Sequence, residues 1–199
     1  MENVLTKGDR SQRSLKIAAR EIFKSDGYTN SRVQDIAARA GFSNGAFYRY
    51  FSDKRAVMMA LMQDLLEDAY EFAHSPWEAG NPANSIYTST RRYLNYYRSN
   101  ADLFSILVEA SQVDTEVEQM WAAVRTDVID RITRMLTRAR EEGLLRPKVN
   151  PAVAASLLAA MTDHYAYLWL VLERLPDSDI DEVSDQITRI WSSGVFCED

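Results

Sequence analysis

The chain has 199 residues, 46% of them hydrophobic and 26% charged, with a formal net charge of -6. This composition is that of a globular protein and excludes a disordered chain. Seven glycines and five prolines are few for this length, which disfavours a turn-rich all-β fold. The single cysteine allows no internal disulfide, so we expect a reducing compartment, the cytoplasm.

The charge is distributed unevenly along the chain. Residues 1–55 carry 11 lysines and arginines against 6 aspartates and glutamates, whereas residues 56–199 carry 12 against 23. A basic segment attached to an acidic remainder indicates that the basic segment binds a polyanion. We therefore predict two domains that meet near residue 55.

The first part of the chain has the periodicity of helices and no alternation typical of strands. We predict a first helix that ends at Gly27, because glycine readily adopts the left-handed conformation that closes a helix. Ser31 is predicted to cap a short second helix, and Ser43 a short third one. Ser52 is predicted to cap a fourth helix that runs to about His74.

Residues 75–83 contain two prolines and a glycine, the clearest interruption of the helical pattern. Asn100 and Asn150 are placed to act as N-caps of later helices. The further predicted helices span about 84–98, 101–112, 115–142, 151–174 and 179–194. The predicted fold class is therefore all-α, with about nine helices.

The segment from 152 to 172 is largely apolar and about as long as a membrane span. Thr162, Asp163 and His164 interrupt its centre, and a charge in mid-bilayer is costly. We therefore predict a helix buried within the protein and no membrane partner. The N-terminus lacks an apolar run, so no secretory signal is expected.

Residues 31–51 have the spacing of a helix-turn-helix, in which two short helices flank a tight turn at residues 40–43. The turn needs Gly41, because a side chain would strain it. Ile36, Phe42 and Phe47 are predicted to form a small core beneath the two helices. The second helix of such a motif lies in the major groove of DNA.

About 45 consecutive residues carry a family resemblance. The run AAREIF at 18–23, DIA at 35–37, AGFS at 40–43 and GAFYRYF at 45–51 resemble the N-terminal domain of TetR-type transcriptional repressors. The usual pair of threonines before the second helix is replaced here by Ser31 and Arg32. The remaining residues resemble the family only in the number and length of their helices.

The resemblance implies a ligand-responsive repressor that binds a palindromic operator in double-stranded DNA as a homodimer. A small hydrophobic or amphipathic effector would release it. In these terms residues 1–55 form a three-helix DNA-binding domain of the helix-turn-helix type. Residues 56–199 form a helical effector-binding and dimerisation domain.

The resemblance also implies a set of DNA-binding residues. Tyr48, Tyr50 and Lys54 match positions that contact the DNA backbone, and the charge of Arg32 can reach a phosphate. Other members match positions that can face base edges, where Gln and Asn suit adenine and Arg suits guanine. The full predicted set is Arg32, Gln34, Ser43, Asn44, Ala46, Tyr48, Arg49, Tyr50 and Lys54.

Effector binding is predicted on the middle helices, where aromatic residues recur at helical spacing. Such a stripe is also typical of an ordinary core, and that alternative stays open. The predicted effector-binding residues are Tyr93, Tyr97, Phe104, Leu107, Val108, Trp121, Val124 and His164. The helices at 151–174 and 179–194 carry more apolar surface than one core needs, which favours a homodimer.

No catalytic or metal-binding pattern is present in the sequence. His74 and His164 are the only histidines, and neither the HExxH nor the CxxC spacing occurs. We therefore predict no enzymatic activity, no metal and no cofactor, and interpret His164 as a hydrogen-bonded core residue. A helical protein-interaction adaptor without specific DNA binding is an alternative, and a small helical enzyme is another.

Overall fold

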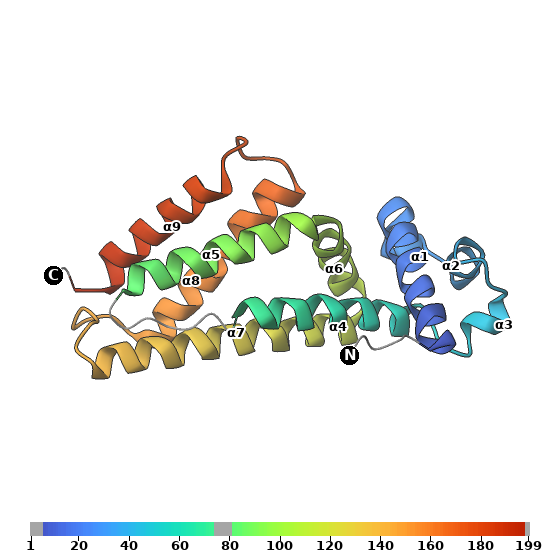
Figure 1. Cartoon of the computed structure of the whole chain (residues 1–199), viewed down its shortest axis with the longest axis horizontal. Helices are drawn as coiled ribbons and strands as arrows, with labels where there is room; N and C mark the ends of the chain where they lie inside the picture. Colours follow the sequence, from blue (N-terminus) through green and yellow to red (C-terminus); the bar gives the residue numbers. More distant parts are fainter. Residues whose placement is uncertain (1–5, 74–80, 198–199) are drawn as a thin grey trace. The chain divides into compact units, whose positions relative to one another are not determined.

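The chain folds almost entirely into helices (Figure 1). The computed structural model describes residues 6–73 and 81–197, with side chains over 6–65 and 81–197. In chain order the elements are α1 (Lys7–Asn30), α2 (Val33–Arg39), α3 (Asn44–Phe47), α4 (Lys54–Ala73), α5 (Pro82–Ser99), α6 (Ala101–Val113), α7 (Thr115–Glu141), α8 (Pro151–Ala166), the π-helical segment η1 (Tyr167–Val171) and α9 (Ile180–Val195). Over the described residues, the predicted all-α class with about nine helices is confirmed.

Packing divides the chain into two compact units. The first unit comprises Met1–Glu67 and Ser105–Gln119, and the second comprises Asp68–Phe104 and Met120–Asp199. The end of α6 and the start of α7 therefore belong to the same unit as the helix-turn-helix, although they lie far from it in the sequence. The predicted boundary near residue 55 separates a DNA-binding domain from an effector-binding domain, and it stays a prediction.

The helix-turn-helix of the first unit rests on a small apolar core. Phe23 of α1, Ile36 of α2 and Phe47 of α3 are almost fully buried, and the Phe47 ring lies 5.8 Å from that of Phe51. Phe42, which was predicted to belong to this core, is only half-buried. α2 packs against α1, and α3 packs against α2.

The junction between α1 and α2 differs from the predicted one. Gly27 has a φ of 78°, as expected, but the chain resumes a helical path and α1 ends at Asn30. Ser31 is not the N-cap of α2, because it is the C-cap of α1, where its hydroxyl donates to the Gly27 carbonyl at 2.5 Å. The residue before α2 is Arg32, which makes no side-chain capping bond. Ser31 therefore stabilises the end of α1 instead of the start of α2.

The predicted N-cap residues of the later helices differ in how well the structure matches them. The N-terminus of α4 is capped by Asp53, not by Ser52, since the Asp53 carboxylate accepts an N–H of the first turn at 2.8 Å. The predicted end at His74 lies outside the described residues. Asn100 closes α5, where its amide donates to the carbonyl of Tyr96, and it also directly precedes α6, where its carbonyl accepts the N–H of Phe104 at 3.1 Å, so it occupies the predicted N-cap position. Asn150 is confirmed, because its side chain accepts two N–H groups of α8.

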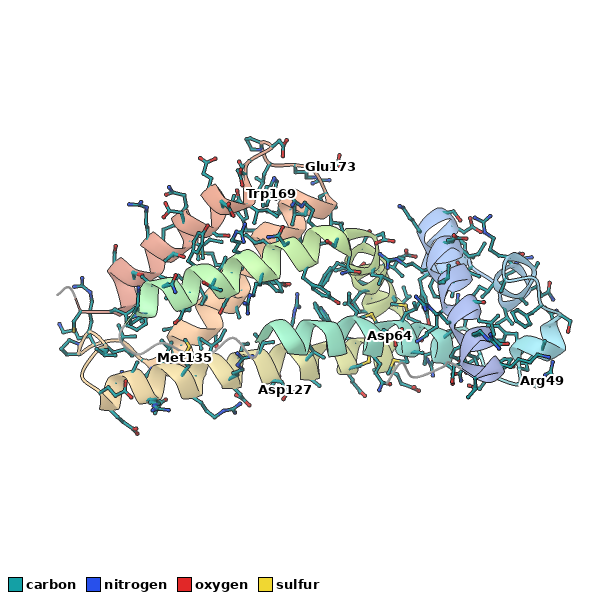
Figure 2. All side chains as sticks on the ribbon, in the orientation of Figure 1. Arg49, Asp64, Asp127, Met135, Trp169 and Glu173 are labelled. Atoms are coloured by element: carbon teal, nitrogen blue, oxygen red, sulfur yellow. The ribbon has the colours of Figure 1, made fainter. Side chains whose placement is uncertain are left out.

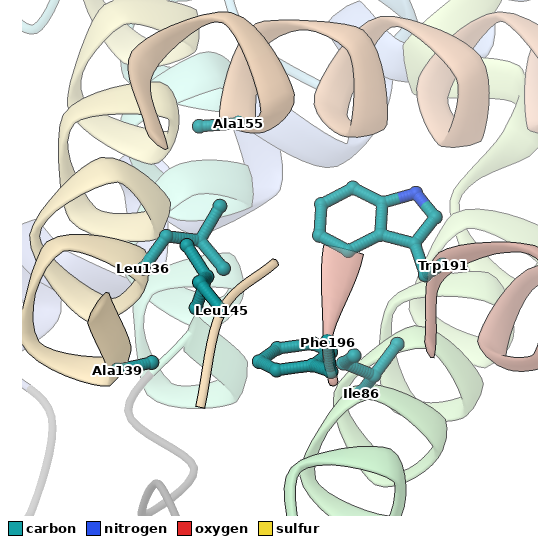
Figure 3. Packing of buried hydrophobic residues seen from close by; sticks show 7 residues of the cluster. All are labelled: Ile86, Leu136, Ala139, Leu145, Ala155, Trp191 and Phe196. Atoms are coloured by element: carbon teal, nitrogen blue, oxygen red, sulfur yellow. The ribbon is translucent and has the colours of Figure 1, made fainter. Parts of the chain in front are cut away.

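The core of the second unit joins its long helices to the end of the chain (Figure 3). Its cluster of buried hydrophobic residues comprises Ile86, Leu136, Ala139, Leu145, Ala155, Trp191 and Phe196. Leu145 and Phe196 also form an isolated antiparallel bridge, supported by a bond from the Cys197 N–H to the Leu144 carbonyl at 2.9 Å. The segment after α9 is therefore fixed to the turn after α7.

The segment predicted as one helix over 151–174 changes its helical type. It is α-helical to Ala166 and π-helical from Tyr167 to Val171, and the N–H of Leu172 bonds to the Tyr167 carbonyl at 3.0 Å. Glu173 follows with a positive φ of 50°. Among the described residues, no helix has both the length and the apolar composition to cross a membrane.

Candidate nucleic-acid interface

The turn between α2 and α3 is held by its own backbone. Gly41 has a φ of 75°, which a residue with a side chain adopts only under strain. The N–H of Phe42 bonds to the Ala37 carbonyl at 2.8 Å. Ser43 caps α3, because its hydroxyl accepts the N–H of Ala46 at 3.2 Å, as predicted from the sequence. These bonds fix the angle at which α3 leaves α2.

Polar side chains surround this turn on its solvent side. Tyr48 is 57% exposed, and the edge of its ring packs on buried Phe47 at 5.6 Å. Tyr48 is therefore an accessible phenol in a fixed position. Arg49 lies at the α3 end of the first unit (Figure 2). The exposed members of the predicted DNA-binding set are Arg32, Gln34, Ser43, Asn44, Tyr48 and Arg49, while Tyr50 and Lys54 are half-buried.

Ala46 is the one predicted DNA contact that the structure removes. It is buried on the inner side of α3, beside Phe47, and its N–H is taken by the Ser43 hydroxyl. Its methyl group therefore contributes to packing and does not face solvent. The periodicity of a four-residue helix was too short to reveal which side Ala46 occupies.

Lys54 has internal partners that the sequence did not indicate. Its ammonium donates to the carbonyls of Tyr28 at 2.6 Å and Thr29 at 3.1 Å, and lies 4.6 Å from the centre of the Tyr28 ring. Partial burial lowers the pKa of Lys54. The ammonium group satisfies carbonyl oxygens at the end of α1, where the helix dipole favours a positive charge. A phosphate contact by Lys54 would use its third hydrogen.

Asp114, between α6 and α7, connects that junction to the helix-turn-helix. Its Oδ2 accepts bonds from the Tyr28 hydroxyl at 3.1 Å and from Arg55 Nε at 2.7 Å. Its Oδ1 accepts the N–H of Glu116 at 3.1 Å, in the first turn of α7. The side chain is only 9% exposed. One carboxylate thus joins α1, α4 and α7 within the first unit.

The electrostatic state of Asp114 follows from these bonds. Burial acts to raise the pKa of Asp114, but the hydrogen bonds from Arg55 and Tyr28 outweigh it and the pKa lies below its usual value. Burial, with the charge of Asp114, raises the pKa of the Tyr28 hydroxyl. The phenol therefore stays protonated and remains a donor.

A second carboxylate, that of Glu109 in α6, contacts the end of α1. Glu109 Oε1 accepts the N–H of Thr29 at 3.1 Å. A Cβ atom on Gly27 would lie 3.0 Å from the same oxygen, closer than most contacts allow. Gly27 therefore serves both the kink of α1 and the approach of Glu109. The sequence did not indicate either carboxylate, because their partners on α1 and α4 lie 59 or more residues away.

The second unit brings together four of the predicted effector-binding residues. The rings of Tyr97 and Phe104 stack at 3.7 Å, Phe104 meets Trp121 at 6.2 Å, and Tyr93 meets Tyr97 at 5.7 Å. Aromatic contact of this kind is compatible with both a core and a ligand site. We call Tyr93, Tyr97, Phe104 and Trp121 the aromatic cluster.

The other four predicted effector-binding residues differ in burial and in the unit to which they belong. Leu107 and Val108 belong to the first unit, where Leu107 is fully buried. Val124 is half-buried in the second unit. His164 is exposed, so its interpretation as a core residue was wrong. The helical pattern could not decide this because α8 is apolar on several sides.

Two charged groups beside the aromatic cluster were missed. Asp163 of α8 accepts the Tyr93 hydroxyl at 2.8 Å and pairs with Arg125 of α7 at 2.6 Å. The Arg125 guanidinium lies 4.8 Å from the centre of the Trp121 ring. The described residues contain no group of three or more side chains suited to a metal ion.

The fold and the exposed polar face of α2 and α3 define a DNA-binding protein of the helix-turn-helix class. Residues 17–61 match the model for bacterial regulatory proteins of the tetR family, and residues 86–197 match the model for the C-terminal domain of the transcriptional regulator EthR. The chain therefore belongs to the TetR family of transcriptional regulators. This confirms the resemblance found in the sequence.

Relatives of known function cover nearly the whole chain. EthR of Mycolicibacterium smegmatis is 22% identical over 191 residues, covering 95% of this chain and 88% of EthR. NalD, the secondary repressor of a multidrug efflux pump in Pseudomonas aeruginosa, has the same fold, with a TM-score of 0.77, 20% identity and coverage of 96% of this chain and 98% of NalD.

SmeT, the repressor of a Stenotrophomonas maltophilia multidrug efflux pump, gives a TM-score of 0.75 with 22% identity, covering 94% of this chain and 91% of SmeT. SmeT is also known as a complex with triclosan. These relatives are transcriptional regulators and not enzymes, in agreement with the prediction of no enzymatic activity.

Replacing Asp114 by Asn should destabilise the protein by about 1.5–3 kcal/mol, because two hydrogen bonds to a charged group are weakened. The pKa of Asp114 lies below its usual 3.8. Its contribution to stability is therefore complete above that pH and is lost as the pH falls through the lowered pKa. Chemical denaturation across this range should show an acid loss in wild type that is smaller in Asp114→Asn.

The control is Glu116→Gln, which removes the exposed partner of Arg55 and should cost less than about 1 kcal/mol. Equal losses for both variants at neutral pH would contradict the central place of Asp114.

Gly45 should matter for DNA binding and not for folding. It is exposed within α3, and a Cβ atom there would meet nothing within 4 Å. Gly45→Ala should therefore leave stability unchanged or raise it by up to about 1 kcal/mol. We expect operator affinity to fall by about tenfold, because glycine lets the backbone of α3 approach DNA. Fluorescence anisotropy with labelled operator DNA measures this affinity.

The matched control is Gly8→Ala in α1, where an added Cβ makes only an ordinary contact at 3.6 Å. It should leave operator affinity unchanged. Full operator affinity in Gly45→Ala would place α3 farther from DNA than we expect.

Proposed function

We propose that this TetR-family regulator is a repressor that binds a palindromic operator as a homodimer and releases it when a small hydrophobic or amphipathic effector binds. The observation that supports DNA binding most directly is the exposed polar face of the helix-turn-helix. Gln34 and Asn44 have side chains suited to adenine, and Arg49 has one suited to guanine. The basic excess of residues 1–55 supplies attraction to phosphate. Its proposed location is the cytoplasm.

The relatives support the repressor part of the proposal. NalD and SmeT are repressors of multidrug efflux pumps, and SmeT forms a complex with triclosan. The second unit of this chain matches the C-terminal domain of EthR over residues 86–197. We propose that its aromatic cluster takes part in effector binding, since apolar and aromatic side chains typically line such sites.

The homodimer is proposed from an exposed apolar face on α8. Val153 and Leu157 lie four residues apart on this helix, Leu157 is 67% exposed, and Ile190 of α9 is exposed as well. Large apolar side chains at i and i+4 make one continuous surface. A second copy of the chain would cover it, and a symmetric dimer would present two recognition helices to the two halves of a palindrome.

Coupling between effector and operator is proposed to run along helices that belong to both units. α4, α6 and α7 each continue from the first unit into the second. We propose that effector binding shifts α4, and moves α6 and α7 with the Asp114 junction that holds α1. The spacing of the two recognition helices would change, and the DNA-binding form would lose population. Operator and effector must then weaken each other's binding by the same factor.

Two variants separate phosphate contacts from base contacts. Tyr48→Ala should weaken binding to operator and to random DNA alike, because a backbone contact carries no sequence information. Arg49→Ala should lower operator affinity by about 1–3 kcal/mol and leave affinity for random DNA nearly unchanged. Anisotropy titrations with both DNAs at one fixed salt concentration measure the difference.

Equal losses on both DNAs for Arg49→Ala would contradict its role in base recognition. If the wild-type protein binds neither the DNA upstream of its own gene nor random DNA, the result would support the alternative of a protein-interaction adaptor.

Leu157→Glu should dissociate the homodimer, since it places a charge on the proposed apolar interface. Sedimentation equilibrium should show monomer for the variant and dimer for wild type, and the variant should lose operator affinity. Val128→Glu is the matched control on an exposed site of α7 and should remain dimeric. A wild-type monomer at micromolar concentration would exclude this arrangement.

A further inference from the structure

Beside the aromatic cluster, the guanidinium of Arg125 forms a salt bridge with Asp163. The Arg125 guanidinium lies over the face of Trp121 at 4.8 Å and contacts Asp163 Oδ2 at 2.6 Å. Planar cations bind to the faces of aromatic rings and to carboxylates in this manner. The position of the guanidinium therefore marks a place with the chemistry to accept a cationic group.

The two partners of this salt bridge differ in how firmly they are held. Asp163 is 21% exposed, and its other oxygen accepts the hydroxyl of Tyr93 at 2.8 Å. Arg125 is 53% exposed and belongs to a flexible side chain that can turn into solvent. Leaving the pair therefore costs Arg125 little, whereas Asp163 is held in place by its bond from Tyr93.

Aromatic rings adjoin the Asp163 carboxylate, and of these Tyr97 and Phe104 are buried and Tyr93 and Trp121 half-buried. Tyr93, which bonds to Asp163, contacts Tyr97, and Tyr97 stacks on Phe104. Phe104 contacts Trp121 beside Arg125, so the ring contacts lead back to the salt bridge. Burial raises the pKa of Tyr97, and the nearby charge of Asp163 raises it further. The Tyr97 phenol therefore stays neutral.

The helix that carries Asp163 is irregular at this point. The π-helical segment begins at Tyr167, one turn after Asp163, and its first N–H bonds to the carbonyls of Asp163 and His164. π-helical turns are rare, and they are frequent at functional sites. The π-helical segment therefore begins close in sequence to Asp163, the carboxylate that contacts Tyr93 of the aromatic cluster.

We propose that Asp163 and Trp121 bind the positively charged group of an amphipathic aromatic effector, which displaces Arg125, while its apolar part packs on the aromatic cluster. This rests on the proposed function, for which it names the chemical class of the effector. A neutral molecule would leave the salt bridge unchanged. An anion would have to approach Asp163 through the one cation that already neutralises it.

Phenylethylguanidine tests this proposal, since it joins an aromatic ring to the same cation that Arg125 carries. Its uncharged analogue is phenylethylurea, which has nearly the same shape. Calorimetric titration of the full-length protein without DNA should give binding at least about tenfold tighter for the guanidine than for the urea. Equal affinities for the two compounds would overturn the proposal.

Two variants test the roles of the charged residues. Arg125→Met removes the internal competitor and keeps an apolar stem, so affinity for phenylethylguanidine should rise by about fivefold. Asp163→Asn should lower it by about tenfold and leave affinity for phenylethylurea unchanged. A gain of affinity cannot arise from misfolding, so Arg125→Met is the decisive variant. Unchanged or weaker binding by Arg125→Met contradicts displacement of Arg125.

A separate titration with operator DNA distinguishes this inference from the proposed function. Binding of phenylethylguanidine without loss of operator affinity would support the cation site and contradict release by that site. Release of the operator by neutral hydrophobic compounds alone would support the proposed function and contradict the cationic class.

Discussion

The Asp114 carboxylate is the interaction on which the arrangement of the first unit depends. It accepts the Tyr28 hydroxyl from α1, the Arg55 guanidinium from α4 and a backbone N–H at the start of α7. Glu109 adds a bond to the N–H of Thr29 where Gly27 allows close approach. The helix-turn-helix therefore rests on residues that lie at the α6–α7 junction, about sixty to eighty positions later in the chain.

Features decided by neighbouring residues could be predicted from the sequence. The Gly41 turn, the Ser43 cap and the Asn150 cap are fixed within a few residues, and the structure contains all three. Ser31 closes α1 and its hydroxyl donates to the Gly27 carbonyl, so it does not cap α2. The burial of Ala46 was not predicted, because α3 is too short for a periodic pattern. The Asp114 junction has no local signal.

The two units combine polar groups with apolar packing in the same manner. In the first unit, an enclosed carboxylate joins helices next to a buried aromatic ring, and in the second, Asp163 joins α5 and α7 beside the aromatic cluster. The aromatic residues were predictable from their spacing, whereas their charged partners were not. Net charge alone would have pointed away from DNA, and its distribution between residues 1–55 and the remainder pointed toward it.

The central claim is that the Asp114 junction transmits effector binding to the DNA-binding face. The direct test measures operator affinity by anisotropy with and without a ligand found by a thermal-shift screen, in wild type and in Asp114→Asn. Saturating ligand should weaken operator binding by about 5–150-fold in wild type. In Asp114→Asn, ligand affinity should persist and the weakening should shrink toward onefold. An equally large effect of ligand in both proteins would contradict the account.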